Sequence, residues 1–140
     1  MATQPGISRL LLEALRALDA EIVSALQDRA AGGLTPGQAY AMLHIDRAGT
    51  RLTELAGRAQ VSKQAMMQVV DDLAELGLVR RAPDPADARA KVVKLTARGL
   101  RERAQARRAL ASVEAASKRF LGDRRYEALR GMLTDLASAE

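Results

Sequence analysis

The sequence predicts a mostly helical protein in which one short β-hairpin interrupts a series of helices, and three observations support this prediction. Apolar residues recur at steps of three and four along much of the 140-residue chain, which is the spacing of amphipathic helices. Thr35, Ser62 and Thr96 each stand directly before such a pattern, where a helix-capping side chain is expected. Two β-prone runs, at 78–82 and 91–95, flank a segment broken by two prolines.

Residues 8–30 are expected to form the first helix, with Ser8 as its cap and Gly32 and Gly33 beyond its end. Its apolar positions share one face and are Leu11, Leu15, Leu18, Ile22 and Leu26. Such a helix would be roughly 35 Å long, whereas a compact chain of this size has a radius of gyration of only ~14 Å. We therefore expect the helix to reach apolar surface outside its own subunit.

Three further helices are expected before the hairpin, and their cap and stop residues give their bounds. They are 35–47, with Thr35 as cap, Pro36 as first residue and Gly49 beyond its end; 53–59, with Thr53 as cap; and 63–76, with Ser62 as cap and Gly77 beyond its end. The second and third of these are joined by a tight turn at Val61-Ser62. A short helix, a tight turn and a second capped helix together predict a helix-turn-helix.

The hairpin is expected to have a long tip. Pro83 and Pro85 exclude regular structure from residues 83–90, so the two strands would be joined by an eight-residue connection. A connection longer than most hairpin loops is often functional. Arg89 is expected near the tip, free to reach beyond the body of the protein. Asp87 is either close enough to orient Arg89 through a charge-assisted hydrogen bond or a solvated turn residue.

Two helices are expected after the hairpin. Thr96 caps one that runs to about Leu121, and Asp123 caps the last. The last helix carries an apolar stripe of Leu129, Met132, Leu133 and Leu136, with little remaining sequence to cover it. Like the first helix, it is expected to find a partner surface elsewhere.

The charged residues are unevenly distributed. The chain has 22 basic and 17 acidic residues, a net charge of +5, and 18 of the basic residues are Arg. The preference for Arg over Lys is explained equally well by a GC-rich genome and by a polyanionic partner. However, residues 77–110 hold a net charge of +7, whereas residues 1–50 hold a net charge of −1. This concentration on and after the hairpin favours a polyanion such as nucleic acid.

The composition disfavours several other classes of function. The chain has no Cys and one His, so disulfides, thiolate chemistry, a metal site and a cofactor are not expected. An enzyme is not expected, because no nucleophile–base set can be assembled and the adjacent Asp71 and Asp72 point apart on a helix. The run Leu10-Leu11-Leu12 is cut by Glu13, which argues against a signal peptide or membrane span and favours a cytoplasmic protein.

The helix at 63–76 has two chemically different faces. Its apolar face is expected in the core and consists of Met66, Val69, Val70, Leu73 and Leu76. The first turns of the opposite face present Lys63, Gln64, Met67 and Gln68, directly after Ser62. In a DNA major groove, Gln can bond to adenine, Met can contact a thymine methyl group, and Lys and Ser suit phosphate oxygens. Each of these residues, taken singly, is also typical of an ordinary solvated face.

A basic hairpin that directly follows a helix-turn-helix is the pattern of a winged helix. Arg81 and Lys91 lie on the two strands, and an Arg at the tip can enter a minor groove, where the potential is most negative when the groove is narrow. The candidate DNA-binding residues are therefore Ser62, Lys63, Gln64, Met67, Gln68, Arg81, Asp87, Arg89 and Lys91.

The sequence resembles the MarR family of bacterial transcriptional regulators over residues 34–99. The matching motifs are L-T-x-x-Q from Leu34, the helix-turn-helix, L-x-x-x-G-L-V-x-R from Leu73, D-P-x-D-x-R from Asp84 and L-T-x-x-G from Leu95. A helix-turn-helix alone is weakly specific, but its combination with the hairpin motif and the following L-T-x-x-G is strongly specific. Gln68 stands where members often carry Arg, which suggests more reliance on the hairpin for binding.

The resemblance implies a homodimer in which residues 1–33 and 97–140 join the subunits and residues 34–96 form a DNA-binding lobe. Each lobe would read half of a palindromic operator in double-stranded DNA. The protein would then be a repressor that a small phenolic or anionic effector releases. The absence of Cys excludes the thiol-sensing branch of the family. The alternative function is a winged-helix dimer without DNA binding that acts as a protein-interaction module or antirepressor, against which the basic Lys63 and Arg89 argue.

Tyr40 and His44 are the candidate effector contacts under this resemblance. They lie four residues apart and therefore on one face of the second helix, which in the family borders the effector pocket. The alternative is a packed, hydrogen-bonded pair at a helix interface.

Overall fold

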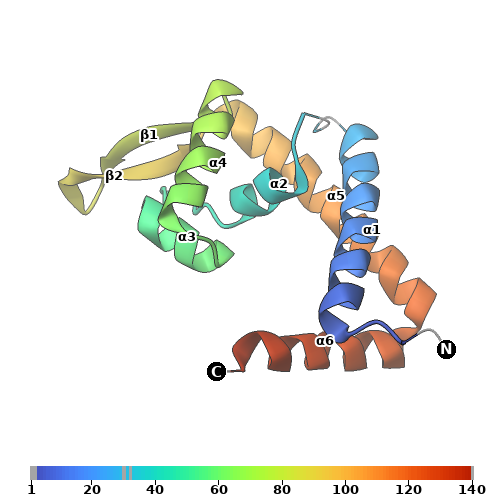
Figure 1. Ribbon diagram of the computed structural model, residues 1–140. Helices are drawn as coiled ribbons and strands as arrows, with labels where there is room; N and C mark the ends of the chain where they lie inside the picture. The colour runs from blue at the N-terminus through green and yellow to red at the C-terminus, as the bar shows by residue number, and fades with distance from the viewer. Residues whose placement is uncertain (1–2, 30, 32, 140) are drawn as a thin grey trace.

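The computed structural model describes residues 3–29, 31 and 33–139, and in this part of the chain it contains six helices and one two-stranded antiparallel sheet (Figure 1). The elements are α1 (Ile7–Gln27), α2 (Pro36–Leu43), α3 (Leu52–Ala59), α4 (Lys63–Glu75), β1 (Val79–Asp84), β2 (Asp87–Leu95), α5 (Ala97–Leu121) and α6 (Asp123–Ser138). The predicted fold class and element order are confirmed. None of the described helices combines the length and apolar character that a membrane span needs.

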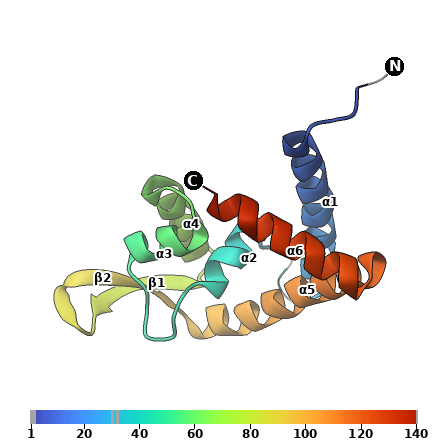
Figure 2. The same ribbon diagram turned by 90° about the horizontal axis from the view of Figure 1, so that it is seen from below.

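The elements form two regions that α5 connects. The helices α2, α3 and α4 gather beside the hairpin, while α1, α6 and the end of α5 lie at the other side of the molecule (Figure 1). Seen from below, α5 runs along one edge from the base of the hairpin to α6 (Figure 2). One hydrophobic core extends from α1 through the three small helices to the base of the hairpin, with Leu26, Met42, Leu55 and Leu73 fully buried.

The first helix begins and ends near its predicted bounds but is capped differently. Gly6 precedes the helix and no side chain caps it, so the prediction of Ser8 as cap is wrong. The last helical residue is Gln27, and the predicted end at Ala30 and Gly32 lies outside the described residues. Ile22 and Leu26 are buried, whereas the apolar residues of the preceding turns remain exposed. These exposed residues leave most of the helix without a covering surface in its own chain.

The second helix is shorter than predicted. Thr35 caps it in a reciprocal capping box with Gln38, as the sequence suggested, but it ends at Leu43 instead of near Arg47. The difference has a tertiary cause, because the carbonyl oxygens that would continue the helix are taken by arginines. Arg58 donates to the oxygen of His44 and Arg103 to the oxygen of Ile45, each at 2.7 Å. The chain then leads to Thr50, whose backbone pairs with Val93 of β2.

The helix-turn-helix forms as expected, with one change in capping. Arg51 precedes α3 and makes no side-chain cap, so the prediction of Thr53 as cap is wrong. Gln60 closes α3 in the left-handed region, with a φ of 55°. Ser62 caps α4 by accepting a hydrogen bond from the backbone N–H of Ala65 at 3.0 Å, as predicted.

The hairpin is longer and its tip shorter than predicted. The strands continue through the proline segment, and only Pro85 and Ala86 separate them, so the expected eight-residue connection is wrong. Pro83 is accommodated in β1 because each strand of a two-stranded sheet is an edge strand. A backbone N–H that faces away from the partner strand is not needed for pairing, so proline is tolerated at such a position. The register changes from Pro83 opposite Lys91 to Asp84 opposite Asp87, so residues 88–90 form a bulge in β2.

The last two helices lie close to their predicted bounds. Thr96 caps α5, which ends at Leu121 as expected. Gly122, with a φ of 80°, precedes α6, so Asp123 is the first helical residue and not the predicted cap. Tyr126 of α6 donates a hydrogen bond to Glu114 of α5, and Lys118 lies over the Tyr126 ring. These contacts fix the turn between the two helices.

The first turn of α5 packs against the start of β1 at very close range. The Thr96 hydroxyl donates to the oxygen of Gly77 at 2.7 Å, and the Thr96 N–H donates to the oxygen of Leu78 at 3.0 Å. The same hydroxyl accepts from the N–H of Gly99. A Cβ at position 99 would overlap the carbonyl oxygen of Leu78 and lie 2.9 Å from its carbonyl carbon. The L-T-x-x-G motif is thus a packing requirement at this junction.

We predict that Gly99→Ala destabilises the protein by about 1–3 kcal/mol or more, because the new methyl group must displace backbone. Urea unfolding at one fixed protein concentration measures the change. The matched control is Gly57→Ala, since Gly57 is also helical but has open space where a methyl group would lie. There, replacement of helical Gly should stabilise by roughly 0.5–1 kcal/mol. Equal stability changes in the two variants would contradict this account of position 99.

Candidate nucleic-acid interface

The exposed start of α4 carries the first group of candidate residues. Met66 is 2% exposed and points into the core together with Val70 and Leu73, whereas Leu76 is exposed, unlike the prediction. The candidates Lys63, Gln64, Met67 and Gln68 are all exposed on the other face, next to the capping Ser62. Gln68 donates to Asp72 at 3.0 Å. The predicted division of this helix into a core face and an exposed face is therefore confirmed except at Leu76.

The hairpin tip carries the second group. The Arg89 side chain is 92% exposed and lies in the bulge of β2, not in a loop. Asp87 Oδ1 accepts a hydrogen bond from Arg89 Nε at 3.2 Å and another from the Arg89 backbone N–H at 3.1 Å. Of the two interpretations of Asp87, the orienting contact is the one observed. Because an ion pair this exposed adds little stability, its effect is to aim the guanidinium.

Arg81 and Lys91, the two candidate residues on the strands, differ in whether their charged groups are engaged within the protein. Arg81 forms an ion pair with Asp71 of α4 at 2.6 Å, so this strand is tied to the helix-turn-helix. Lys91 is exposed opposite Pro83 on the other strand. The Asp71 and Asp72 carboxylates diverge as predicted, since Asp71 binds Arg81 and Asp72 binds Gln68.

Arg51, a residue that the sequence did not single out, also acts at the hairpin through Asp84. Arg51, directly before α3, donates from Nε to Asp84 Oδ2 at 2.7 Å. Asp84 lies in the quoted D-P-x-D-x-R motif, but nothing in the sequence indicated that its partner would be 33 positions earlier. The pKa of the Asp84 carboxyl is lowered by the backbone N–H of Ala86 and by Arg51, and Asp84 in turn raises the pKa of Arg51. Both groups are therefore charged at neutral pH.

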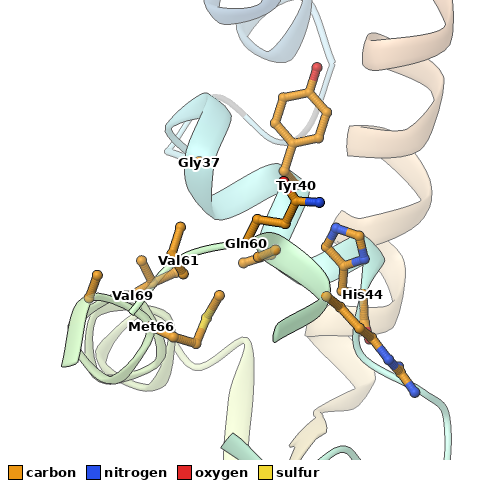
Figure 3. A pocket seen from close by; sticks show the side chains of 11 residues that line it. Gly37, Tyr40, His44, Gln60, Val61, Met66 and Val69 are labelled. Carbon is orange, nitrogen blue, oxygen red and sulfur yellow. The ribbon is translucent and has the colours of Figure 1, made fainter. Parts of the chain in front are cut away.

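A cleft of about 390 Å³ lies between α2 and the helix-turn-helix (Figure 3). It is lined mainly by apolar groups, and its lining residues include Tyr40, His44, Arg58, Val61, Met66 and Val69. Both candidate effector residues thus border one cavity. The part of the chain that the structure describes gives no hydrogen bond between Tyr40 and His44, and the Tyr40 hydroxyl points away from His44 in Figure 3. The structure therefore does not show the hydrogen-bonded pair, and an effector-binding role for Tyr40 and His44 stays a prediction.

The charges around the cleft are already balanced. Among the lining residues, Arg58 carries the one permanent positive charge, and it donates to Asp46 at 2.9 Å and to Glu54 at 2.8 Å. These contacts lower the pKa of Asp46 and raise the pKa of Arg58. At the other side, burial and then the nearby Glu114 and Asp19 raise the pKa of Tyr40, so its hydroxyl stays protonated and can donate. Within the described ranges, no group of His, Asp and Glu could hold a metal ion.

Comparison with known proteins finds a family model that matches part of the chain and several solved structures with a similar fold. Residues 32–90 match the model of the MarR family. No curated protein matches the sequence. The transcriptional repressor CouR, in a structure bound to a 23-mer DNA duplex, is 26% identical, with a TM-score of 0.81 over 94% of this chain and 92% of that one.

Two further structures share the fold over nearly the whole length. CouR from Rhodococcus jostii RHA1 bound to p-coumaroyl-CoA is 22% identical, with a TM-score of 0.81 over 99% of this chain and 98% of that one. BpsR from Bordetella bronchiseptica, whose DNA binding is regulated by 6-hydroxynicotinic acid, is 18% identical. Its TM-score is 0.85 over 100% of this chain and 99% of that one.

Proposed function

We propose that this chain is a homodimeric repressor of transcription. Its residues 32–90 match the model of the MarR family, and nearly its full length has the fold of solved MarR-family regulators. It binds a palindromic operator and releases it when a small organic molecule enters the cleft. The observation that carries the proposal is the exposed Arg89, aimed by Asp87 beside a recognition helix whose first turns present a free polar face. The DNA-bound state of the similar CouR supports it.

Each DNA contact follows from side-chain chemistry. Gln64 and Gln68 read adenine edges in the major groove, Met67 contacts a thymine methyl group, and Lys63 and the Ser62 hydroxyl bind phosphates. Gln68 must exchange its hydrogen bond with Asp72 for one with the base.

On the hairpin, Arg89 enters the minor groove and Lys91 binds a phosphate. Asp87 acts through Arg89 by orienting its guanidinium. Arg81 also acts indirectly, because its guanidinium is engaged by Asp71.

A second copy of the chain covers the exposed apolar faces of α1 and α6. These faces are larger than isolated surface residues would explain, and they include Leu10, Leu11, Leu12, Leu15, Leu18, Leu129, Met132, Leu133 and Leu136. In this proposal residues 1–33 and 97–140 form the dimerisation region, and residues 34–96 form the DNA-binding lobe. Two-fold symmetry of such a dimer matches the symmetry of a palindromic operator.

The effector carries an uncharged phenolic or other aromatic group in the cleft. Arg58 is compensated by Asp46 and Glu54, so a carboxylate in the cleft would lose hydration without gaining a free cation. A neutral aromatic group fits the apolar walls and can accept a hydrogen bond from Tyr40. Because the cleft lies between α2 and α4, a molecule bound in it can shift α4, the proposed recognition helix. Such a shift requires only a modest difference in the affinity of the molecule for the two positions of α4.

Selection of duplexes from a random pool by the full-length protein tests the proposed function. The expected result is a palindrome with half-sites about one helical turn apart, bound with an affinity that falls steeply with salt. On the selected duplex, Arg89→Ala should weaken binding by ~1–3 kcal/mol. The control Arg101→Ala removes the same charge from an exposed position of α5 and should have a much smaller effect. If no sequence is enriched, the protein is not a sequence-specific regulator, and the interaction-module alternative gains support.

Dimerisation is tested by a charge on α6. Leu133→Glu should weaken self-association by ~2–4 kcal/mol, because a carboxylate would be buried without a partner in the subunit interface. Sedimentation equilibrium measures the dissociation constant. Thr134→Glu introduces the same charge at the next residue, which faces away from the apolar stripe, and should leave the dimer intact. A wild-type protein that sediments as a monomer would refute the dimer.

The charge preference of the cleft is tested with 4-hydroxybenzoate and its methyl ester, which differ mainly in charge. The ester should raise the melting temperature and weaken binding to the selected duplex more strongly than the acid at pH 7. Tyr40→Phe should reduce the response to the ester, because it removes the donor. Stronger binding of the acid, or no binding of either compound, would overturn the assignment of an uncharged aromatic group to this cleft.

A further inference from the structure

The hairpin projects from the helices, and few contacts hold its tip. Figures 1 and 2 both show β1 and β2 extending away from the α2–α4 region. At the base, the backbone of the buried Thr50 pairs with Val93 through two hydrogen bonds of 2.9 and 2.8 Å. Two ion pairs between described residues also join the hairpin to other elements. They are Arg81, which lies opposite Val93, with Asp71, and Arg51 with Asp84. The second of these lies nearest the tip.

Asp84 is the point at which the tip is held. Its side chain is only 13% exposed, and its two oxygens have different partners. Oδ2 accepts from Arg51 Nε at 2.7 Å, and Oδ1 accepts from the backbone N–H of Ala86 at 2.9 Å. Arg51 therefore fixes the same carboxylate that shapes the two-residue turn. Because the pKa of Asp84 is lowered, this carboxylate remains charged well below neutral pH.

The turn leads directly to Arg89. Asp87 follows Ala86, and its Oδ1 accepts from both the backbone and the guanidinium of Arg89. A continuous series of contacts thus runs from Arg51 through Asp84 and the turn to the side chain proposed to enter the minor groove.

Arg51 is itself fixed to the helix-turn-helix. It stands at the N-cap of α3, where its carbonyl oxygen accepts the first helical hydrogen bond, from Leu55 N–H at 2.9 Å. The Arg51–Asp84 pair therefore sets the hairpin tip relative to the recognition unit. A tip that moved freely would lose conformational entropy on binding DNA, whereas a tip already in place would not.

We propose that Arg51 is a positioning residue for DNA binding, which holds the hairpin tip so that Arg89 is presented to the minor groove. This inference rests on the proposed function. Arg51 acts through Asp84 and Arg89, and its guanidinium is engaged within the protein. Since the pair is partly exposed, its loss changes the order of the tip far more than the stability of the whole fold.

A double-mutant cycle on the selected duplex tests the proposal. Arg51→Met should weaken binding about fivefold to tenfold in the wild-type protein, with little change in melting temperature. In the Arg89→Ala background the same substitution should have almost no effect, because the contact that Arg51 positions has already been removed. Asp84→Asn should behave like Arg51→Met, and the Arg51→Met/Asp84→Asn double variant should be no weaker than either single variant.

Arg47→Met is the matched control, since Arg47 is an exposed arginine on the same connection between α2 and α3. Its effect on binding should be equal with and without Arg89. If Arg51→Met weakens binding by the same factor in both backgrounds, Arg51 contacts DNA directly and the positioning role is wrong. If the wild-type protein selects no duplex, the proposed function itself fails, so the two failures are distinguishable.

Discussion

The close approach of α5 to the start of β1 is the constraint on which the rest of the structure depends. Gly77 and Leu78 connect α4 to β1, Thr96 caps the long helix α5 that leads to α6, and Gly99 lies in the first turn of α5. One hydroxyl, on Thr96, both caps α5 and donates to the Gly77 carbonyl. The helices α4 and α5 and the hairpin therefore share one junction. A side chain at position 99 would force them apart, which ties the geometry of the proposed DNA-binding lobe to that of the proposed dimerisation region.

The sequence predicted the elements whose signals are local and missed those that depend on distant residues. Thr35, Ser62 and Thr96 cap the helices they were expected to cap, because a cap acts within three residues. The other three predicted caps, Ser8, Thr53 and Asp123, are instead the first or second residues of their helices, so the local signal located these helices but not their caps. The end of α2 was predicted too late, because it is determined by Arg58 and Arg103, which bond to carbonyl groups far away in the sequence. No periodicity or propensity reports such contacts.

The same distinction applies to the candidate site. The polar face of α4 and the Asp87–Arg89 contact could be predicted, since each involves residues at most a few positions apart. The role of Arg51 could not, since its partner lies on another element. The prolines of the hairpin were misinterpreted because their effect depends on context. In a wide sheet Pro83 would interrupt a ladder, but in this two-stranded sheet it occupies a position that needs no donor.

The short helix α3 connects the cleft with the hairpin, and regulation of DNA binding by a molecule in the cleft would have to link these two features. Its last residues, with Arg58 and Ala59, line the cleft, and Arg51 at its start holds Asp84 of the hairpin. Eight helical residues move as a nearly rigid unit, so a displacement at one end is felt at the other. A molecule that wedges α2 away from α4 would disturb Arg58, whose guanidinium bonds to the connection after α2. The cleft and the hairpin tip can then be coupled without any large change in the core.

The number of basic residues in the chain, 22, overstates the number of positive charges that are free to bind DNA. In the part of the chain that the structure describes, Arg51, Arg58, Arg81 and Arg98 are all paired with carboxylates of the same subunit. Arg89 is also paired, but its side chain is almost fully exposed, so a phosphate or a base edge can still reach it. Arg51, Arg58 and Arg81 join different elements of the proposed DNA-binding lobe, whereas the exposed residues are the ones that DNA could contact. Affinity for DNA should therefore depend on a few side chains whose positions the internal ion pairs control, and loss of an internal pair should reduce binding even where it removes no contact with DNA.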